Sequence, residues 1–363
     1  MGLAILGLGT AQPLHSIAQD DAAELAKAFC CHTNEHARLL PILYQRTQIQ
    51  QRGSVLLESA DGAGVQQSFF SPAVGHVDHG PTTGRRMQRY AQEAGPLALT
   101  AARRALDESQ LPAAQVTDLI TISCTGFVAP GIDVQLMKAL NLPSALQRTH
   151  IGFMGCHGAL NGLRVASALA EAEPSARILL CAVELCSLHF CYGWDSGKIV
   201  ANSLFADGAA ALVAGAQGRA TDQEWRVVAT GSYLFPNSED AMTWRIGDHG
   251  FEMTLSTNVP LLLRAHLRAW LERWLARYEL QMRQIRSWAI HPGGPRILQT
   301  AASCLNLTDD AIAVSREVLA ECGNMSSATI LFVLERLRRR GAPRPCVALG
   351  FGPGLAAEVV LFA

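Results

Sequence analysis

The 363-residue sequence carries little charge and contains no long apolar run. Charged residues make up 17% of the chain, and the formal net charge at pH 7 is −1. Nucleic-acid-binding proteins need a surplus of Lys and Arg, so this balance argues against a polyanion as ligand. A hydrophobic fraction of 49% excludes a disordered chain. Because no run of about 18 uncharged apolar residues occurs, the sequence predicts no membrane span.

Targeting signals are also missing. The segment from Met1 to Pro13 is apolar and strand-like, without the basic head and the small-residue cleavage site of a signal peptide. Leu6 stands where a myristoylation motif needs Ser or Thr. We therefore expect a cytoplasmic protein. The ten cysteines show no pairing pattern, which predicts reduced thiols, at least one of them available for catalysis.

Apolar strand-like runs alternate with helical patterns along the whole chain, which indicates an α/β protein with helices covering a sheet. The predicted strands are Leu3–Leu8, Leu119–Ser123, His150–Phe153, Arg177–Val183, Ala209–Ala214, Arg226–Thr230, Ser287–Ile290, Pro345–Phe351 and Ala356–Phe362. The two parts of the chain repeat a similar order of strands and turns. This predicts an internal duplication with a boundary near Gln217–Glu224, giving an N-terminal half of residues 1–217 and a C-terminal half of residues 218–363.

Helices are predicted where caps and apolar periodicity agree. They are Pro96–Asp107, a helix from about His157 to Ala172, Val259–Tyr278 with Asn258 as its N-cap, and Ser326–Arg340. Segment Glu58–Arg89, rich in Gly, Ser and His, is expected to have no regular structure.

Cys156 is the first candidate for catalysis. It lies in Gly155-Cys156-His157-Gly158, between a short strand and the start of a helix. The positive end of a helix dipole lowers a thiol pKa, and the glycines allow another molecule to approach closely. The alternative is a small buried apolar residue in a glycine-rich turn.

Two further polar residues follow at the ends of predicted elements. His291 lies between a buried strand and Pro292-Gly293-Gly294-Pro295, at the kind of strand end where sites of open α/β sheets gather. An ordinary hydrogen-bonded histidine is the alternative. Asn324 precedes the helix from Ser326, and it could serve only as a helix N-cap.

A glycine-rich loop separates the last two predicted strands. It runs Gly350-Phe351-Gly352-Pro353-Gly354 and could shape a pocket or donate an N–H group to an oxyanion.

Taken in order, these segments closely resemble the type III polyketide synthases of the chalcone and stilbene synthase superfamily. The likeness covers nearly the whole chain and includes Phe205 in Leu204-Phe205-Ala206-Asp207-Gly208. It implies a duplicated thiolase-like fold with two βαβαβ-type halves and five αβαβα layers. It also implies a homodimer in which Ala129, before Pro130, crosses into the partner's cavity. No nucleic-acid partner, metal or organic cofactor is implied.

The resemblance further implies a mechanism. A Cys156 thiolate paired with His291 would take an acyl group from an acyl-CoA. His291 and Asn324 would then hydrogen-bond the thioester oxygen of malonyl-CoA as CO2 leaves, and the carbon nucleophile would extend the chain before cyclisation.

Pocket residues are carried over from the family one by one. Phe205 resembles its gatekeeper between the CoA tunnel and the acyl cavity, and Phe251 is expected to be a second one. The cavity positions fall on Cys124, Cys186, His189 and Ser326, and Arg46 is the candidate CoA contact. Cysteines in place of the threonines of the plant enzymes favour a fatty-acyl starter, while pyrone, resorcinol and phloroglucinol products remain open.

Other functions stay open at this point. A β-ketoacyl-acyl-carrier-protein synthase of the third kind shares the Cys-His-Asn set, but has its histidine in a His-Gln-Ala-Asn setting. Hydroxymethylglutaryl-CoA synthase needs a glutamate base for which the sequence offers no candidate. A non-catalytic scaffold would need no activated thiol. Finally, Cys30-Cys31-His32 and His36 place two imidazoles at helical spacing, which fits either a metal site or a solvated helix face.

Overall fold

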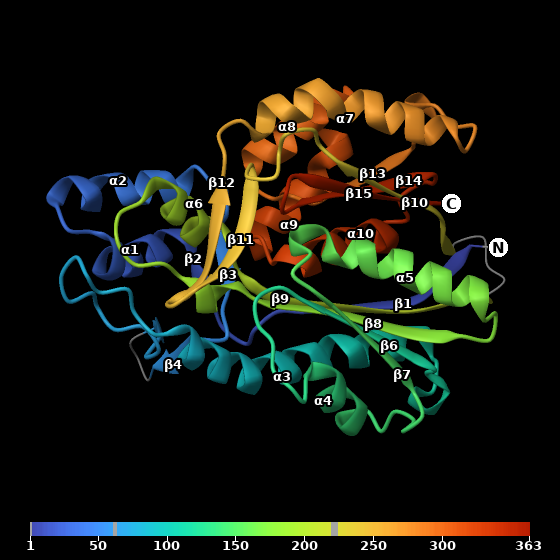
Figure 1. Ribbon diagram of the computed structural model, residues 1–363, viewed down its shortest axis with the longest axis horizontal. Coiled ribbons are helices and arrows are strands. Elements are labelled where there is room, and N and C mark those ends of the chain that lie inside the picture. The colour runs from blue at the N-terminus through green and yellow to red at the C-terminus, as the bar shows by residue number, and fades with distance from the viewer. Residues whose placement is uncertain (1, 61–63, 219–223) are drawn as a thin grey trace.

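The apolar runs of the sequence form the strands of one nine-stranded mixed sheet in the computed structural model, which describes residues 2–60, 64–218 and 224–363 (Figure 1). The sheet order is β13-β14-β15-β10-β1-β9-β8-β6-β7. Its strands are β1 (Leu3–Ala11), β6 (Asp118–Ser123), β7 (Gln147–Gly152), β8 (Arg177–Leu185), β9 (Asp207–Gly215), β10 (Trp225–Leu234), β13 (Ser287–Ile290), β14 (Cys346–Gly352) and β15 (Ala356–Phe362). All nine predicted strands are present, with ends shifted by a few residues.

Three short hairpins lie outside this sheet. They pair β2 (Ser16–Ala18) with β3 (Gln51–Gly53), β4 (Glu58–Ala60) with β5 (Gly64–Gln66), and β11 (Met242–Gly247) with β12 (Gly250–Leu255). The described α-helices are α1 (Gln19–Cys30), α2 (Asn34–Gln45), α3 (Thr83–Ser109), α4 (Ile132–Ala139), α5 (Gly158–Ala172), α6 (Ser196–Leu204), α7 (Val259–Ala276), α8 (Pro295–Leu305), α9 (Ala313–Cys322) and α10 (Thr329–Arg339).

Strand pairing follows the same order on both sides of the β1–β10 contact. In the N-terminal part, β1 pairs antiparallel with β9, β9 antiparallel with β8, and β8 parallel with β6. In the C-terminal part, β10 pairs antiparallel with β15, β15 antiparallel with β14, and β14 parallel with β13. This repeated topology supports the proposed duplication, although most of the expected boundary, residues 219–223, lies outside the described residues.

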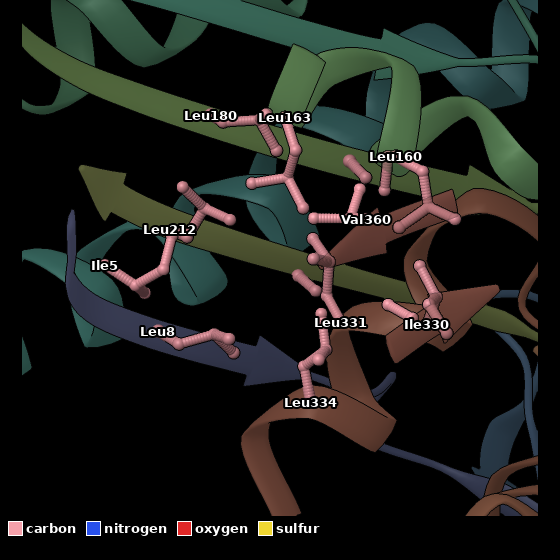
Figure 2. Close-up of a cluster of buried hydrophobic side chains, with 14 of the residues drawn as sticks. Ile5, Leu8, Leu160, Leu163, Leu180, Leu212, Ile330, Leu331, Leu334 and Val360 are labelled. Carbon is pink, nitrogen blue, oxygen red and sulfur yellow. The ribbon is translucent and has the colours of Figure 1, made fainter. Parts of the chain in front are cut away.

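Helices separate the two parts of the sheet into the layers expected of the thiolase-like fold (Figure 1). Helices α3 and α4 cover the β6–β9 side, α7 and α8 cover the β13–β15 side, and α5 and α10 lie between them. Figure 2 shows the central layer, where Leu160 and Leu163 of α5 and Leu331 and Leu334 of α10 pack among strand side chains such as Val360. Both inner helices are therefore buried, and their N-terminal ends are fixed by the core.

Some local predictions were wrong. Helix α3 begins at Thr83 rather than at Pro96, because Thr82 caps it and Pro96 is accommodated inside a long helix. The segment expected to be irregular therefore contains β4, β5 and the first turns of α3. Helix α7 starts where predicted, but the Asn258 side chain makes no capping hydrogen bond.

The two histidines near the N-terminus do not share one helix face. Helix α1 ends at Cys30 and α2 begins at Asn34, so His32 lies in the link between the helices and His36 lies in the first turn of α2. The His32 ring lies 4.2 Å from that of His76, and His36 stacks on Trp194 at 4.0 Å. Among the described residues, no group of three His, Cys, Asp or Glu side chains could hold a metal ion. In the same ranges, no helix has the length and apolar character needed to cross a bilayer.

Candidate active site

Cys156 lies where the edge strand β7 turns into helix α5. A single 3₁₀ turn, Gly155–His157, makes the connection, so the thiol stands at the N-terminal end of the helix as predicted. Gly155 has φ +66°, and a Cβ there would come within 2.3 Å of Pro353. Glycine at position 155 is therefore needed both for the turn and for the close approach of the Gly350–Gly354 loop.

The Gly350–Gly354 loop closes the site next to this turn. A Cβ on Gly352 would lie 2.4 Å from the His157 ring, so the loop and the turn are in direct contact. Pro353 has no N–H group, and the Gly354 N–H donates to the Met242 carbonyl at 2.8 Å. These two residues are thus not oxyanion donors, and their contribution is to the shape of the cavity.

Asn324 joins the two halves of the chain at the site. Its backbone N–H donates to Leu204 O and its carbonyl accepts from the Ala206 N–H, both at 2.9 Å, so Phe205 and Asn324 lie side by side. The Asn324 side-chain oxygen accepts from the Ser326 N–H at 2.9 Å, and its Nδ2 donates to Gly293 O at 3.3 Å. Asn324 is therefore not the N-cap that the sequence suggested, because Met325 and Ala328 hold the N-cap positions of the 3₁₀ turn and of α10, and its side chain is instead a hydrogen-bond partner of the Cys156 thiol.

His291 is placed by its backbone at the end of β13. Its N–H donates to Leu349 O at 2.8 Å, and its carbonyl accepts from the Gly293 N–H at 3.0 Å. The imidazole is 1% exposed, and among the described residues neither ring nitrogen has a hydrogen-bond partner. Burying an imidazole without hydrogen-bond partners costs free energy. Such a group is expected where the ring nitrogen bonds a substrate.

Burial sets the charge states of the thiol and the imidazole. Desolvation raises the pKa of Cys156 to about 12, although hydrogen bonds with Ser326 and Asn324 act in the opposite direction. Desolvation, with a smaller effect of His157, lowers the pKa of His291 to about 3. The helix N-terminus alone predicts a lowered pKa for the Cys156 thiol, but desolvation outweighs it. At neutral pH the Cys156 thiol is therefore protonated and the His291 imidazole is uncharged.

A small cavity opens on Cys156. Its walls include the predicted residues Cys124, Cys186, Phe205 and Ser326 together with Pro353, and also Trp244 and Met253, which the sequence analysis did not single out. Burial keeps both wall cysteines protonated, because their pKa values are raised well above the ordinary thiol range. They therefore act as small, weakly polar walls.

Glu184 is a buried carboxylate beside this cavity. It is 0% exposed and accepts hydrogen bonds from the Cys124 N–H, Thr125 Oγ1 and Ser327 Oγ. Burial raises its pKa despite these donors. One acidic residue within the otherwise apolar run of β8 was the signal in the sequence that could have revealed it. Its bonds connect β6 and β8 of one half with the Ser326–Ala328 turn of the other.

Comparison with known proteins identifies this arrangement. The model of the N-terminal domain of chalcone and stilbene synthases matches residues 2–218, and that of their C-terminal domain matches residues 226–363. The chain belongs to the chalcone and stilbene synthase family. It is accordingly a type III polyketide synthase, a condensing acyltransferase.

Individual members of the chalcone and stilbene synthase family match along the whole chain. The alpha-pyrone synthesis polyketide synthase-like Pks18 of Mycobacterium tuberculosis is 33% identical over 366 residues, covering 99% of this chain and 90% of that protein. The 1,3,6,8-tetrahydroxynaphthalene synthase of Streptomyces peucetius is also 33% identical, covering 99% and 93%. The crystal structure of PKS-I from the brown alga Ectocarpus siliculosus superposes with a TM-score of 0.91 at 29% identity, covering 99% and 98%.

Two residues carried over from the family lie next to this synthase's small cavity rather than in it. His189 lines a second, larger cavity, where its Nε2 donates to Thr125 O at 2.6 Å and its Nδ1 accepts from the Phe251 N–H at 2.9 Å. Phe251 stacks on the His189 ring at 4.2 Å and also lines only the larger cavity. Met253 and Trp244 instead border both cavities together with Phe205.

Arg46 does not line either cavity of this synthase. It is exposed at the C-terminal end of α2. Arg52 is instead the cation next to Phe205. Its Nη1 donates to the backbone carbonyls of Asn202 at 2.6 Å and Phe205 at 2.7 Å. It fixes the backbone of Phe205.

Removing the buried imidazole of His189 is expected to make the stability of this synthase less sensitive to acid. Desolvation lowers the pKa of His189 to about 3, below the ordinary value near 6.5. Its stabilisation is therefore present above pH 6.5 and is lost progressively as the pH falls toward 3. Between pH 7 and pH 5 the loss amounts to about 2 kcal/mol per such histidine.

Denaturant unfolding of the wild type and His189→Gln at pH 7 and pH 5 measures this effect. Glutamine keeps a donor and an acceptor but does not titrate. The wild type should lose about 2 kcal/mol more than the variant over this interval. Equal losses would show that His189 is already protonated in the folded protein.

Proposed function

We propose that this synthase loads an acyl group from acyl-CoA on Cys156 and extends it by repeated decarboxylative condensation with malonyl-CoA. The observation that supports this most directly is that Asn324 is a hydrogen-bond partner of the Cys156 thiol and also donates to the carbonyl of Gly293, two residues after the buried, partner-free imidazole of His291. In the loading step the Cys156 sulfur bonds to the acyl carbon, the thiol proton passes to His291, and CoA leaves with that proton.

Extension uses the same groups in another way. As malonyl-CoA loses CO2, the electron pair moves into an enolate whose charge falls on the thioester oxygen. The Asn324 amide and the His291 imidazole donate hydrogen bonds to that oxygen. The enolate carbon then attacks the acyl carbon on Cys156, and the sulfur is released as the leaving group. Transfer of the extended chain back to Cys156 begins another round, and closure gives a pyrone, resorcinol or phloroglucinol-type ring.

Product analysis tests this proposal. Purified protein is incubated with isotope-labelled malonyl-CoA and a panel of short, aromatic and long-chain acyl-CoA starters, and product masses are recorded. Products heavier than the starter by two or more acetyl units support the proposal. A single condensation, or activity only with an acyl carrier protein, would contradict it and favour the ketoacyl synthase chemistry.

We also propose that the synthase works as a homodimer joined at the β7 edge of the sheet. Strand β7 is the last strand in the order, and its residues are mostly exposed. Phe127, 53% exposed, lies near it and packs against Phe153 at 6.3 Å. An open edge next to an exposed aromatic residue favours pairing with another chain, and it would bring Ala129 of one copy close to the cavity of the other.

A lysine in place of Phe127 is expected to convert the dimer into monomers. The chain mass is 39.0 kDa, so light scattering should give about twice that mass for the wild type and the single-chain mass for Phe127→Lys, with lower activity. Val74→Lys is the matched control, because Val74 is 82% exposed and lies in a loop outside the β7 edge. A monomeric wild type, or a Phe127→Lys variant that remains dimeric with full activity, would contradict this interface.

A further inference from the structure

The nucleophile turn, residues Gly155–His157, stands at the N-terminal end of α5 without an ordinary helix cap. His157 holds the N-cap position of α5, and its side chain makes no capping hydrogen bond. Ser, Thr, Asp and Asn are the usual residues there, because their side-chain oxygens accept from the free N–H groups of the first turn. The turn that carries Cys156 must therefore be fixed by other contacts.

The His157 ring occupies a space between α5 and β14. It is 2% exposed and does not line the Cys156 cavity. Two glycines of β14 leave room for it. A Cβ on Gly350 would lie 3.2 Å from His157 Cβ, and a Cβ on Gly352 would lie 2.4 Å from His157 Cδ2. The ring thus separates the start of α5 from the Gly350–Gly354 loop.

One polar contact holds the ring in this space. His157 Nδ1 lies 2.7 Å from the side-chain oxygen of Asn161, one turn further along α5, and both residues are 2% exposed. In this orientation of the amide the oxygen faces the ring and only accepts, so Nδ1 carries the proton and donates. The other ring nitrogen, Nε2, is buried and has no partner among the described residues. Burial lowers the pKa of His157, so the ring is neutral at neutral pH.

These contacts indicate what a histidine contributes at position 157. A phenylalanine would fill the same space without leaving a buried ring nitrogen unpaired, which costs free energy. The imidazole also donates from Nδ1 to Asn161, which a phenylalanine could not do. The hydrogen bond to Asn161 is therefore the property that favours histidine here.

We propose that His157 is a positioning residue for Cys156, and that its hydrogen bond to Asn161 fixes the nucleophile turn so that the thiol faces His291 during loading. This inference rests on the function proposed above. The bond ties the residue after Cys156 to a part of α5 that is anchored in the core, where Leu160 and Leu163 are buried. His157 itself would touch neither the acyl group nor CoA.

Two substitutions separate the hydrogen bond from the shape of the ring. His157→Phe keeps an aromatic ring but has no donor, whereas His157→Asn keeps an N–H group near the position of Nδ1 and loses the ring. Acyl transfer to Cys156 is followed by the mass of the intact protein, with the acyl-CoA that the product assay shows to be extended fastest. His157→Phe should lower this rate by at least about tenfold, because misplacing a reacting group by about 1 Å can cost about 10²-fold. His157→Asn should stay within about threefold of wild type.

Decarboxylation of malonyl-CoA on the same samples is the readout that a merely structural role would not spare. It depends on His291 and Asn324, so both variants should stay within about twofold of wild type. Asn161→Leu breaks the same bond from its other end. It should slow acyl transfer as much as His157→Phe does, and the double variant should be no slower. Ser167→Ala is the control, because it removes a bond to Leu163 O from a later turn of α5, and it should leave both rates unchanged.

Alkylation of Cys156 by iodoacetamide needs no acyl-CoA and should rank the variants in the same order. Equal losses of acyl transfer and decarboxylation in a folded His157→Phe would overturn the positioning role. So would a wild-type rate of acyl transfer in that variant, or a faster rate in His157→Phe than in His157→Asn. If no acyl-CoA acylates the wild type, the proposed function is overturned, and the alkylation rates still decide the role of His157. Should His157→Phe fail to fold, Asn161→Leu tests the same bond.

Discussion

Replacing Cys156 by alanine is expected to abolish polyketide formation while malonyl-CoA is still decarboxylated. The growing chain has no other attachment point in the proposed mechanism, so product formation should fall by at least about 10³-fold, as is common when a nucleophile is removed. Decarboxylation needs hydrogen-bond donors for the developing oxyanion rather than a thiol, and Asn324 and His291 are retained.

Two assays on the same samples separate these activities. Product is measured by mass spectrometry, and acetyl-CoA and CO2 are measured as the products of decarboxylation. Cys304→Ala is the control, because that thiol lies partly buried on α8, outside both cavities. Polyketide formation at near wild-type rate by Cys156→Ala would eliminate the covalent mechanism.

Substitutions of Asn324 should slow decarboxylation of malonyl-CoA more than acyl transfer to Cys156. Asn324→Asp keeps an acceptor for the Ser326 N–H but removes the amide donor, and it should lower the rate of decarboxylation by about 10²–10³-fold. Asn324→Ala removes both the donor and the acceptor of the Ser326 N–H. It should lose a similar factor in rate and, in addition, about 1 kcal/mol of unfolding free energy.

The comparison between the two variants gives the test its specificity. If the Asn324 side chain served only to accept from the Ser326 N–H, Asn324→Asp would remain active because a carboxylate still accepts that bond. Acyl transfer from the starter to Cys156, followed by the mass of the protein, should be less affected than decarboxylation in both variants. A decarboxylation rate within about threefold of wild type in Asn324→Asp would remove the donor role.

The strands could be predicted because each left a local signal in the sequence, and the three candidate catalytic residues were proposed from signals of the same kind. Buried strands appear as apolar runs, Cys156 and Asn324 each stand beside a glycine that permits a tight turn, and His291 is followed by Pro292-Gly293-Gly294. The resemblance of several motifs in order then fixed the family. The helix predicted at Pro96–Asp107 was shorter than α3, because a proline usually begins or ends a helix. Here Pro96 lies inside the helix, which local sequence rules do not predict.

The cavities could not be predicted, because they are made by residues distant in sequence. Trp244 and Met253 lie on a hairpin of ordinary appearance, and Ala22 and Ala26 look like any helix residues until the opposite wall is known. The hydrogen-bond bridge from His189 to Phe251 likewise joins two segments far apart in the chain. Long-range packing decides these features, and a single sequence carries no direct record of it.

The resting charge state of the nucleophile also depended on tertiary structure. A helix N-terminus favours a thiolate, but desolvation of a fully buried sulfur outweighs it and raises the pKa of Cys156 to about 12. Loading should therefore require proton transfer to His291 when the acyl-CoA is bound.

The central claim is that Cys156 carries the acyl chain, and peptide mass spectrometry tests it most directly. The protein is incubated with a starter acyl-CoA in the absence of malonyl-CoA, quenched in acid and digested. The account predicts one acyl group on the peptide that contains Cys156 and none in the Cys156→Ala variant. An acyl group on one of the other nine cysteines, or an unmodified Cys156 under conditions where polyketide is formed, would contradict it.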